Sequence, residues 1–456
     1  MKRPGFAALL AAAARRRPEH PALIWEGGAL SWRELEARAG GVARSLARAG
    51  VGPGDVVALL LPNGWGFVAA LWGGLALGAI VAPLNPLLAR DERERILGHL
   101  APNALIDAMP PHETASITPG RDGGAPAIIL YTSGSTGQPK GAVLSHAALA
   151  AANESWAGPV MGLTGTDRVL AALPLAHSFG LNGALLAPLL AGATVVLQER
   201  FSPEETLRAI ALHRVTVFAG VATMFSRILE APALASADLS SLRLAVSGAA
   251  PCPWPLASAW RQRTGVRIVR GYGMTELFRP ISYLAADTTD LPDSIGRAVP
   301  GVELRVVDDE LWIKTPAAMD GYLRAPEETA AVLADGWFKT GDLASISAEG
   351  FVSIVGRKRD LILRGGYSVV PGEVEAALLG HPAVAEAAVV GVAHVELGEE
   401  VAAFVTLRPG ARADVAELIA FCRARLAGYK YPRRIDIVTE LPKSATGKIL
   451  KAKLRA

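Results

Sequence analysis

Continuous apolar segments alternate with amphipathic ones along the first two thirds of the chain. Runs of consecutive apolar residues predict buried strands at 56–61, 80–84, 127–131, 169–173, 194–197 and 215–218. Segments with helical periodicity lie between them, and the one at 202–213 begins with Ser202 as N-cap and Glu205 as its capping-box partner. Continuous strands that alternate with helices favour mostly parallel sheets covered on both faces. We therefore expect an α/β fold.

The pattern changes after residue 301. Short segments of alternating apolar and polar residues, separated by turn residues, predict a region of antiparallel strands that ends near residue 359. Beyond it the pattern predicts a compact α+β unit with helices at 373–379 and 415–426 and strands at 384–392, 401–407 and 435–438. No linker rich in Pro, Gly or Ser separates the two parts, which favours a single hinge residue between domains.

Two segments have some features of membrane elements. The uncharged stretch at 66–83 is marginal in length for a span and is interrupted by Gly, so we interpret it as a buried helix followed by a core strand. The amino terminus resembles a signal peptide, but three arginines at 15–17 follow its apolar run where a cleavage site is expected. An amphipathic helix that ends before Pro18 explains it better. The prediction is a chain without a transmembrane segment.

Composition limits the compartment and the partners. Hydrophobic residues make up 51% of the chain and charged residues 20%, which excludes a disordered protein. A net charge of +3 gives no argument for a nucleic-acid partner. The two cysteines, Cys252 and Cys422, are too few for a disulfide framework or a metal cluster. So low a cysteine content is typical of a protein in a reducing compartment. We expect a cytoplasmic protein; a homodimer is compatible with the sequence but not indicated by it.

The strongest chemical signal is the segment YTSGSTGQPKG at 131–141. A predicted strand runs into a loop whose glycines allow backbone amides to turn toward an anion, and its hydroxyls and lysine add further donors. It is not a Walker loop, because Pro139 stands where that motif requires Gly. A plain surface turn is the alternative. The candidate phosphate-binding residues are Thr132, Ser133, Gly134, Ser135, Thr136, Gly137 and Lys140.

Further blocks follow at 173–180 (LPLAHSFG), 271–276 (GYGMTE), 335–342 (DGWFKTGD), 356–366 (GRKRDLILRGG) and 442–451 (PKSATGKILK). With them the chain resembles, over almost its whole length, the adenylate-forming superfamily, and within it most closely the acyl-CoA synthetases. The resemblance implies a domain at 1–359, made of two βα-layered subdomains and a small distorted β-barrel. It also implies a mobile α+β lid at 360–456, with Asp360 as hinge.

The resemblance further implies a reaction in two steps. A carboxylic acid and MgATP give acyl-AMP and pyrophosphate, and coenzyme A then takes the acyl group and releases AMP. The expected cofactors are ATP, Mg²⁺ and coenzyme A. In this reading Lys448 stabilises the charge that develops in the first step, Thr275 contacts the α-phosphate, Glu276 holds the metal, and His177 lies beside the substrate carboxylate.

The same resemblance assigns the nucleotide and thiol sites. The expected adenine-binding residues are Gly248, Ala249, Ala250, Gly271, Tyr272, Gly273 and Met274. Asp342 is expected to bind the ribose and Arg357 the ribose or phosphate, while Arg364, Gly365 and Gly366 are expected to meet coenzyme A. A surface carboxylate at Glu276, core packing of Tyr272 and His177, and a solvated basic turn at Arg357 are the structural alternatives.

The acyl pocket is expected to be mostly apolar, which favours a medium- or long-chain fatty acid or an aryl acid. Its expected wall is Phe218, Val221, Thr223, Met224, Ser247, Leu277, Phe278 and Arg279. Arg279 leaves a second reading open, because it could pair with a second carboxylate, as a malonate-like substrate would need. It could equally be a structurally paired arginine.

Other functions also remain open. An acyl-adenylate ligase that loads a carrier protein shares the same motifs, and a catalytically inactive nucleotide-binding relative would share most of them. The chain is short for the superfamily between Pro86 and Tyr131, and Ala222 stands where the family often has Pro. Neither departure identifies the acid.

Overall fold

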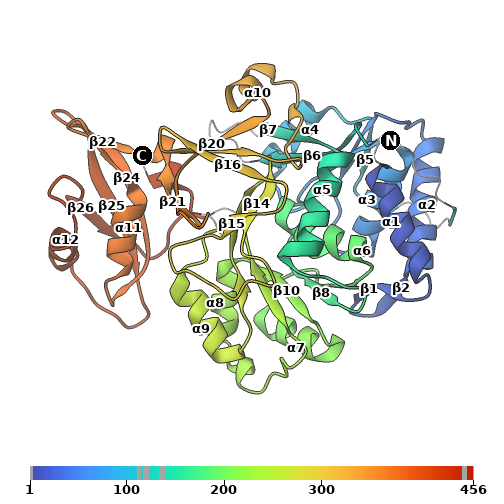
Figure 1. Ribbon diagram of the computed structural model, residues 1–456, viewed down its shortest axis with the longest axis horizontal. Coiled ribbons are helices and arrows are strands. Elements are labelled where there is room, and N and C mark those ends of the chain that lie inside the picture. The colour runs from blue at the N-terminus through green and yellow to red at the C-terminus, as the bar shows by residue number, and fades with distance from the viewer. Residues whose placement is uncertain (1–3, 110–113, 117–122, 133–139, 444–448, 455–456) are drawn as a thin grey trace. The chain divides into compact units, whose positions relative to one another are not determined.

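The computed structural model describes residues 4–109, 114–116, 123–132, 140–443 and 449–454. The chain forms two compact units (Figure 1). The first consists of Met1–Glu303 and Ile313–Phe338, and the second of Leu304–Trp312 and Lys339–Ala456. Our sequence-based boundary, a hinge at Asp360, concerns a movement and stays a prediction.

The first unit contains a seven-stranded sheet in the order β12-β11-β10-β8-β9-β1-β2. Every neighbouring pair is parallel except β1–β2, which form an antiparallel hairpin at the edge. The strands are β1 (Pro21–Trp25), β2 (Gly28–Ser31), β8 (Arg168–Ala171), β9 (Thr194–Leu197), β10 (Val217–Gly220), β11 (Leu244–Ser247) and β12 (Ile268–Val269). The predicted parallel sheet is therefore confirmed.

A second sheet of the same unit has the order β18-β7-β6-β4-β3-β5. Its strands β3 to β6 pair in parallel, whereas β7 pairs antiparallel with both β6 and β18. The strands are β3 (Val56–Leu59), β4 (Ile80–Pro83), β5 (Ala104–Ile106), β6 (Pro126–Thr132), β7 (Lys140–Ser145) and β18 (Gly321–Tyr322). The antiparallel edge makes β6 and β7 a hairpin around the candidate phosphate loop.

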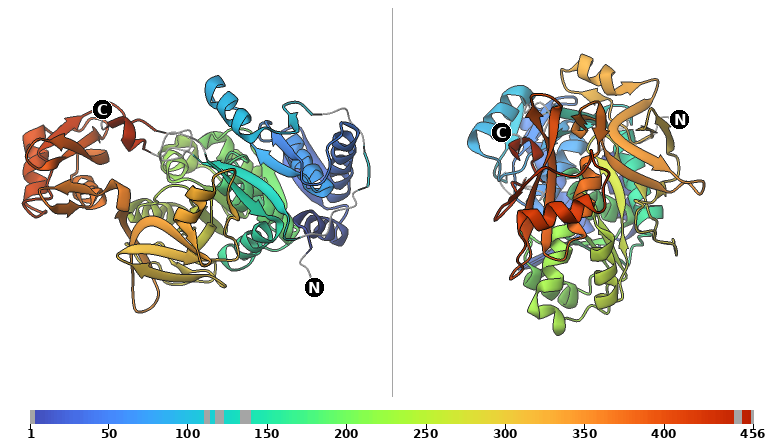
Figure 2. Two further views of the ribbon diagram at one scale, coloured as in Figure 1. Left: turned by 90° about the horizontal axis from the view of Figure 1, so that it is seen from above. Right: turned by 90° about the vertical axis from the view of Figure 1, so that its left-hand side faces the viewer.

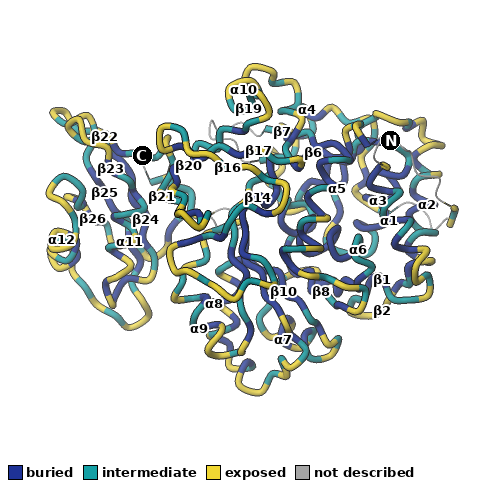
Figure 3. Tube along the Cα trace, viewed as in Figure 1, coloured by how far each residue is buried: buried dark blue, intermediate teal, exposed yellow. Residues whose placement is uncertain are grey.

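Helices cover these sheets, and the strands they cover are mostly buried (Figure 3). In Figure 1, α7, α8 and α9 lie beside β8 and β10 at the lower edge of the unit. The α-helices of the first unit are α1 (Phe6–Arg16), α2 (Trp32–Arg48), α3 (Trp65–Leu77), α4 (Arg90–Leu100), α5 (His146–Ser155), α6 (Ala187–Ala191), α7 (Pro203–His213), α8 (Ala222–Glu230), α9 (Trp254–Thr264) and α10 (Pro326–Val332). Two π-helical segments, η1 (Trp156–Val160) and η2 (Gly180–Leu186), and a 3₁₀ turn, η3 (Pro232–Ala235), complete the unit.

Local sequence signals explain several of these helices. The uncharged stretch at 66–83 is α3 followed by β4, as predicted, and α3 is apolar on all sides because it is buried. At α7 the Ser202 hydroxyl accepts a hydrogen bond from the Glu205 amide, which confirms the N-cap. The expected reciprocal bond from Glu205 is not formed; the Ser202 hydroxyl donates to Glu204 instead. No helix in the described ranges is long and apolar enough to cross a membrane.

Antiparallel strands form two separate sheets, of which the first lies before residue 301 and the second falls in the predicted antiparallel region. One has the order β13-β14-β15, and the other β16-β17-β20-β19 with β21 paired to β20. The strands are β13 (Gly271–Met274), β14 (Phe278–Ser282), β15 (Arg297–Ala298), β16 (Glu303–Val307), β17 (Glu310–Lys314), β19 (Leu333–Ala334), β20 (Trp337–Ile346) and β21 (Val352–Arg357). We expected a small distorted barrel here, but neither sheet closes among the described strands, so that detail is corrected. The division between the two units passes through β16, β17 and β20.

The carboxy-terminal part of the second unit is the predicted α+β structure. Its sheet has the order β23-β22-β25-β24 with β26 beside β25, and α11 and α12 pack against it; Figure 2 gives two further views. Val374, Leu418 and Cys422 of these helices form one core with the strands. Its elements are η4 (Lys358–Asp360), β22 (Ile362–Arg364), β23 (Tyr367–Val369), α11 (Pro371–Leu379), β24 (Val384–His394), β25 (Gly398–Leu407), α12 (Val415–Arg423), β26 (Arg434–Ile437) and η5 (Lys451–Leu454).

Candidate active site

The candidate phosphate loop is anchored at both ends by the β6–β7 hairpin. Thr132 ends β6, Lys140 begins β7, and the two residues are register partners. The Lys140 ammonium lies 5.2 Å from the centre of the Tyr322 ring. Ser133, Gly134, Ser135, Thr136 and Gly137, which the sequence predicts to bind phosphate, lie outside the described residues.

The strand before this loop is held by a partly buried hydrogen bond. The hydroxyl of Tyr131 lies 2.8 Å from Nδ1 of His99, which comes from α4. Burial raises the pKa of Tyr131 to about 12, so the phenol keeps its proton at neutral pH. The carbonyl of His99 in turn accepts a hydrogen bond from Arg324. The entry to the phosphate loop therefore has a fixed position relative to α4.

Thr275, Glu276 and Leu277 connect the hairpin strands β13 and β14. Glu276 is buried, and its Oε1 accepts a hydrogen bond of 2.8 Å from the Tyr322 hydroxyl. Its backbone carbonyl accepts a bond of 2.8 Å from the Met319 amide. Within the described ranges Glu276 forms no ion pair. A buried carboxylate without a cation beside it is suited to bind one.

The turn that carries Glu276 depends on close backbone approach. A Cβ at Gly273 would lie 2.0 Å from the Phe278 carbonyl oxygen, so only glycine fits there. Phe278 itself has φ +56, a conformation that is uncommon for a bulky residue. Gly271 and Tyr272 pair with the opposite strand, and Tyr272 is half-buried, with its hydroxyl 4.0 Å from the Met274 sulfur. The hairpin thus holds an unusual backbone next to the carboxylate.

The predicted adenine-binding turn directly follows β11. Gly248 is buried, and a Cβ there would lie 3.1 Å from the Phe179 ring and 3.3 Å from the Arg279 guanidinium. Ala249 is exposed with φ +63, and Ala250 is half-buried. Strained residues of this kind collect at binding sites. The turn is held by the packing of the residues beneath it.

His177 lies in the connection between β8 and η2. It is half-buried, and its Nδ1 accepts a hydrogen bond of 3.4 Å from the Phe179 amide. Burial lowers the pKa of His177 below its ordinary value, so the ring is neutral near pH 7. A neutral imidazole can donate through Nε2 to a carboxylate oxygen without adding charge.

Most of the predicted acyl-pocket wall is buried, with one exception. Val221, Met224, Leu277 and other members are buried, whereas Thr223 is exposed on α8. Phe218 packs edge-to-face against Phe225 of α8, at 5.3 Å between ring centres. Its ring therefore belongs to the packing between the sheet and the helices. Phe278 and Ser247 are also buried.

Arg279 occupies the centre of a polar and aromatic cluster. The guanidinium donates to the Ser247 carbonyl at 2.7 Å, the Ser282 hydroxyl at 2.9 Å and the Val269 carbonyl at 3.2 Å. It also lies over the Trp156 ring at 4.9 Å, and that ring stacks on Phe179 at 5.6 Å. Burial lowers the pKa of Arg279 to about 9, and the described residues provide no carboxylate that pairs with it.

The second unit contains the predicted ribose-binding pair. Asp342 of β20 and Arg357 of β21 are register partners, and Nε of Arg357 lies 2.9 Å from Oδ1 of Asp342. The Asp342 side chain is only 3% exposed, and the Arg357 guanidinium next to it orients its carboxyl group. The neighbouring Glu310 accepts from the Gly341 amide and pairs with Lys358. These contacts fix the turn before Asp342.

The predicted residues of the lid are only partly described. Arg364 forms a two-bond ion pair with Glu400, at 2.6 and 2.9 Å, which raises the pKa of Arg364. Gly365 and Gly366, at φ +56 and +83, form the turn between β22 and β23. Asp360 ends a 3₁₀ turn. Lys448 lies outside the described residues; the residues that flank its segment, Lys443 and Ile449, pair in an antiparallel bridge.

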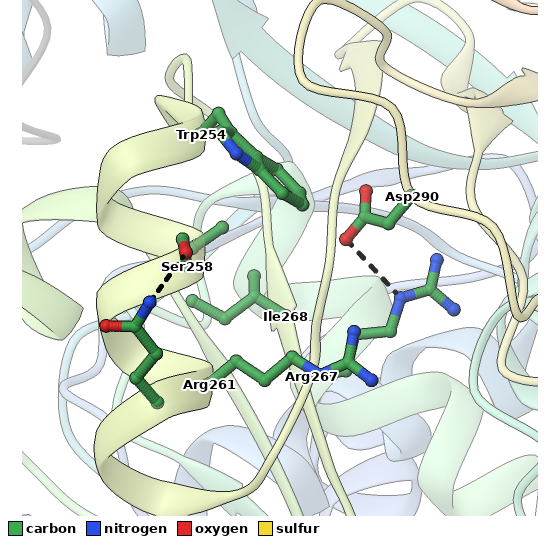
Figure 4. A pocket seen from close by; sticks show the side chains of 8 residues that line it. Trp254, Ser258, Arg261, Arg267, Ile268 and Asp290 are labelled. Carbon is green, nitrogen blue, oxygen red and sulfur yellow. Dashed lines mark hydrogen bonds and ion pairs between the residues drawn. The ribbon is translucent and has the colours of Figure 1, made fainter.

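A further pocket of about 290 Å³ lies beside α9 (Figure 4). Trp254 and Ser258 line one side and Arg267 and Asp290 the other. Arg267 already pairs with Asp290 at 3.6 Å, and Asp290 also pairs with Arg270. Its lining includes none of the residues that the sequence predicted for the site.

Three residues of the site were missed by the sequence reasoning. Tyr322 contacts both Glu276 and Lys140, and Trp156 and Phe179 stack beside Arg279. Phe179 belongs to the block at 173–180, so a signal for it was present. Tyr322 and Trp156 lie in no motif that we considered, and only the pairing of distant strands and helices reveals them.

Comparison with known proteins gives a consistent result. A family model described as AMP-binding enzyme matches residues 10–121 and 107–323, and a model of the AMP-binding enzyme C-terminal domain matches residues 373–448. Feruloyl-CoA synthase from Amycolatopsis sp is 38% identical, covering 97% of this chain and 96% of that protein. Long-chain-fatty-acid–CoA ligase from Bacillus subtilis is 33% identical, covering 98% and 93%.

A solved structure agrees in fold over the whole chain. ATP-bound MatB from Rhodopseudomonas palustris superposes with a TM-score of 0.92 at 31% identity, covering 98% of both chains. The order of the motifs, the layered sheets and these similarities lead to one assignment. The chain belongs to the AMP-binding enzyme family of the adenylate-forming superfamily, and it is an enzyme of the AMP-forming acid–CoA ligase type.

Proposed function

We propose that this enzyme activates an aryl carboxylic acid with ATP and transfers the acyl group to coenzyme A. The observation that carries the choice of acid is the stacked pair of Trp156 and Phe179, which lies beside Gly248 and Arg279. Aromatic side chains next to Arg279, a residue of the predicted acyl pocket, favour a planar ring over a long flexible chain. The similarity to feruloyl-CoA synthase supports the same class.

The proposed reaction has two balanced steps. A carboxylate oxygen attacks the α-phosphorus of ATP, and the bond to the β-phosphate oxygen breaks, which gives acyl-AMP and pyrophosphate. The sulfur of coenzyme A then attacks the acyl carbon, the thiol loses its proton, and AMP leaves. His177, whose pKa is lowered by burial, is proposed to donate a hydrogen bond to the carboxylate in the first step.

The described residues support the nucleotide roles that we propose for them. Thr132 and Lys140 stand at the two ends of the phosphate loop. The turn at Gly248 to Ala250 and Tyr272 are proposed for the adenine. Glu276 fits a Mg²⁺ site, because ATP oxygens commonly supply most ligands of this ion and the protein only one or two carboxylates. When bound, the ion offsets charge on the reacting phosphates. Thr275, beside Glu276, is proposed for the α-phosphate.

The lid carries the remaining proposed roles. We assign Lys448 to the first step and Arg364, Gly365 and Gly366 to coenzyme A, with Asp360 as the hinge between a body at 1–359 and a lid at 360–456. The Arg364–Glu400 ion pair supports a positioned guanidinium beside the glycine turn. A thiol on a carrier protein remains the alternative acceptor.

Replacing Asp342 by Asn is expected to weaken ATP binding about tenfold or more, because the ribose hydroxyls lose a charged acceptor that Arg357 orients. Calorimetric titration of the variant with ATP measures the change. The matched control is Asp436→Asn, which removes an ion pair with Arg434 on the outer strand of the same unit. Equal affinities in the wild type and Asp342→Asn would remove Asp342 from the ribose site.

A second candidate substrate class is an acid with an additional anionic group, favoured by the buried charge of Arg279, which pairs with no carboxylate among the described residues. The geometry weighs against it, since three donors of Arg279 already serve protein acceptors. Arg279→Met is therefore expected to lower stability by about 2–4 kcal/mol and to reduce turnover of all acids alike. Thermal unfolding and kinetics with acetate-, aryl- and diacid-type substrates check this, with the exposed Arg227→Met as control. Selective loss of diacid turnover would favour the second class.

The central experiment is a panel of carboxylic acids with pyrophosphate release as readout. Hydroxycinnamic and arylacetic acids are expected to give the highest kcat/KM, ahead of medium- and long-chain fatty acids and diacids. Acyl-CoA formation is then measured with coenzyme A or a phosphopantetheinylated carrier protein as acceptor. A preference for fatty acids would overturn the aryl assignment, and no acid-dependent pyrophosphate release at all would overturn the proposed activity.

A further inference from the structure

Tyr322 contacts two charged groups of the site that are far apart in the sequence. Its hydroxyl donates to Oε1 of Glu276 at 2.8 Å, and its ring lies beneath the Lys140 ammonium at 5.2 Å. One side chain therefore touches both the carboxylate and the lysine.

Backbone hydrogen bonds also connect the segment around Tyr322 to β7 and to the turn that carries Glu276. On one side β18 pairs with β7, and the Leu323 amide donates to the Gly141 carbonyl at 2.8 Å. On the other side the Met319 amide donates to the Glu276 carbonyl at 2.8 Å. The Thr329 hydroxyl accepts from the Tyr322 amide at 2.9 Å. Residues 319–323 thus connect the end of the phosphate loop with the turn that holds Glu276.

We infer that Tyr322 is a positioning residue for ATP activation, which orients the Glu276 carboxylate toward the cation and the Lys140 ammonium toward the phosphates. A hydrogen bond to one carboxylate oxygen fixes the rotation of the group and leaves the second oxygen for the metal. The ring holds the ammonium through its π face. This inference rests on the proposed function, because it assumes that Glu276 serves a nucleotide-bound cation.

The alternative is a purely structural role, in which the Tyr322 hydroxyl only satisfies the buried Glu276 oxygen. The dependence of ATP binding on Mg²⁺ distinguishes this role from positioning. ATP affinity is measured by calorimetry on the full chain, with Mg²⁺ and with chelator. Tyr322→Phe is expected to lower the Mg²⁺-dependent gain in affinity about tenfold and to leave metal-free binding nearly unchanged. Tyr322→Leu, which also removes the ring, is expected to weaken metal-free binding as well.

Two controls make the outcome specific. Tyr283→Phe removes another buried hydroxyl, which bonds to Leu291 in the same unit, and should leave the Mg²⁺-dependent gain unchanged. In a Glu276→Gln background Tyr322→Phe should have little further effect on that gain, because the two residues act through one carboxylate. Thr329→Val provides a second test, because it removes the hydroxyl that accepts from the Tyr322 amide and leaves the tyrosine itself unchanged. It should lower the Mg²⁺-dependent gain in ATP affinity less than Tyr322→Phe does.

An unchanged Mg²⁺-dependent gain in both Tyr322→Phe and Thr329→Val would overturn the inference. A parallel loss with and without metal would also overturn it, because it would show a structural role only. These readouts need no acid substrate. Failure of the acid panel would therefore refute the proposed function, while the binding data would still decide the role of Tyr322.

Discussion

Lys448→Ala is expected to lower acid-dependent pyrophosphate release about a thousandfold while it spares the transfer of the acyl group from supplied acyl-AMP to coenzyme A. Negative charge accumulates on the α-phosphate oxygens as the carboxylate attacks, and the ammonium offsets it in the transition state. In the second step the acyl–phosphate bond is already formed, so that charge no longer develops in the same place. The two half-reactions should therefore separate.

The measurement uses two assays on one enzyme preparation. Pyrophosphate release without coenzyme A reports the first half-reaction, and acyl-CoA formed from synthetic acyl-AMP reports the second. Lys453→Ala is the matched control, because Lys453 is exposed and belongs to the same basic carboxy-terminal segment. An equal fall of both half-reactions in Lys448→Ala would show that the role proposed for Lys448 is wrong.

Glu276→Gln is expected to lower pyrophosphate release about a hundredfold and to raise the Mg²⁺ concentration needed for half-maximal rate. Glutamine has nearly the same shape and can still accept the hydrogen bond from Tyr322, so packing is preserved. It lacks the negative charge that a hard cation requires. The loss should therefore appear in metal dependence and in kcat more than in folding.

The test titrates Mg²⁺ at saturating ATP and acid, and compares thermal unfolding without ligands. Glu303→Gln serves as control, since Glu303 is an exposed carboxylate paired with Lys314. A Glu276→Gln enzyme with wild-type metal dependence would exclude this carboxylate from the cation site. A large loss of thermal stability would assign it a structural role instead.

The regular elements were largely predictable because they depend on local pattern. The run at 194–197 is β9 without any shift, and the helix at 202–213 begins one residue later than predicted. Strands such as β10 begin or end two residues away from the apolar run, because the pairing with β8 and β11 sets their ends. No local sequence pattern predicted that the β1–β2 hairpin joins the edge of the seven-stranded sheet through β9.

The candidate site was predictable in chemistry but not in contacts. Glu276, Asp342 and Arg357 stand in motifs whose residue types already indicate a nucleotide site. That Asp342 and Arg357 are directly opposite in a strand pair follows only from the register of β20 and β21. Arg279 was ambiguous in the sequence, and the structure shows that its donors are used by two carbonyls and a hydroxyl.

The sequence by itself determined the family, the two-step chemistry and the residues that carry charge, because these depend on residue type and order along the chain. The tertiary structure alone decided which of those charges are buried and which groups orient them. Tyr322 reaches Glu276 across 46 positions of sequence because β18 pairs with β7 and the Met319 amide binds the Glu276 carbonyl. Hydrogen bonding and desolvation act over a few ångströms of space, whatever the distance along the chain, so a linear pattern cannot specify them.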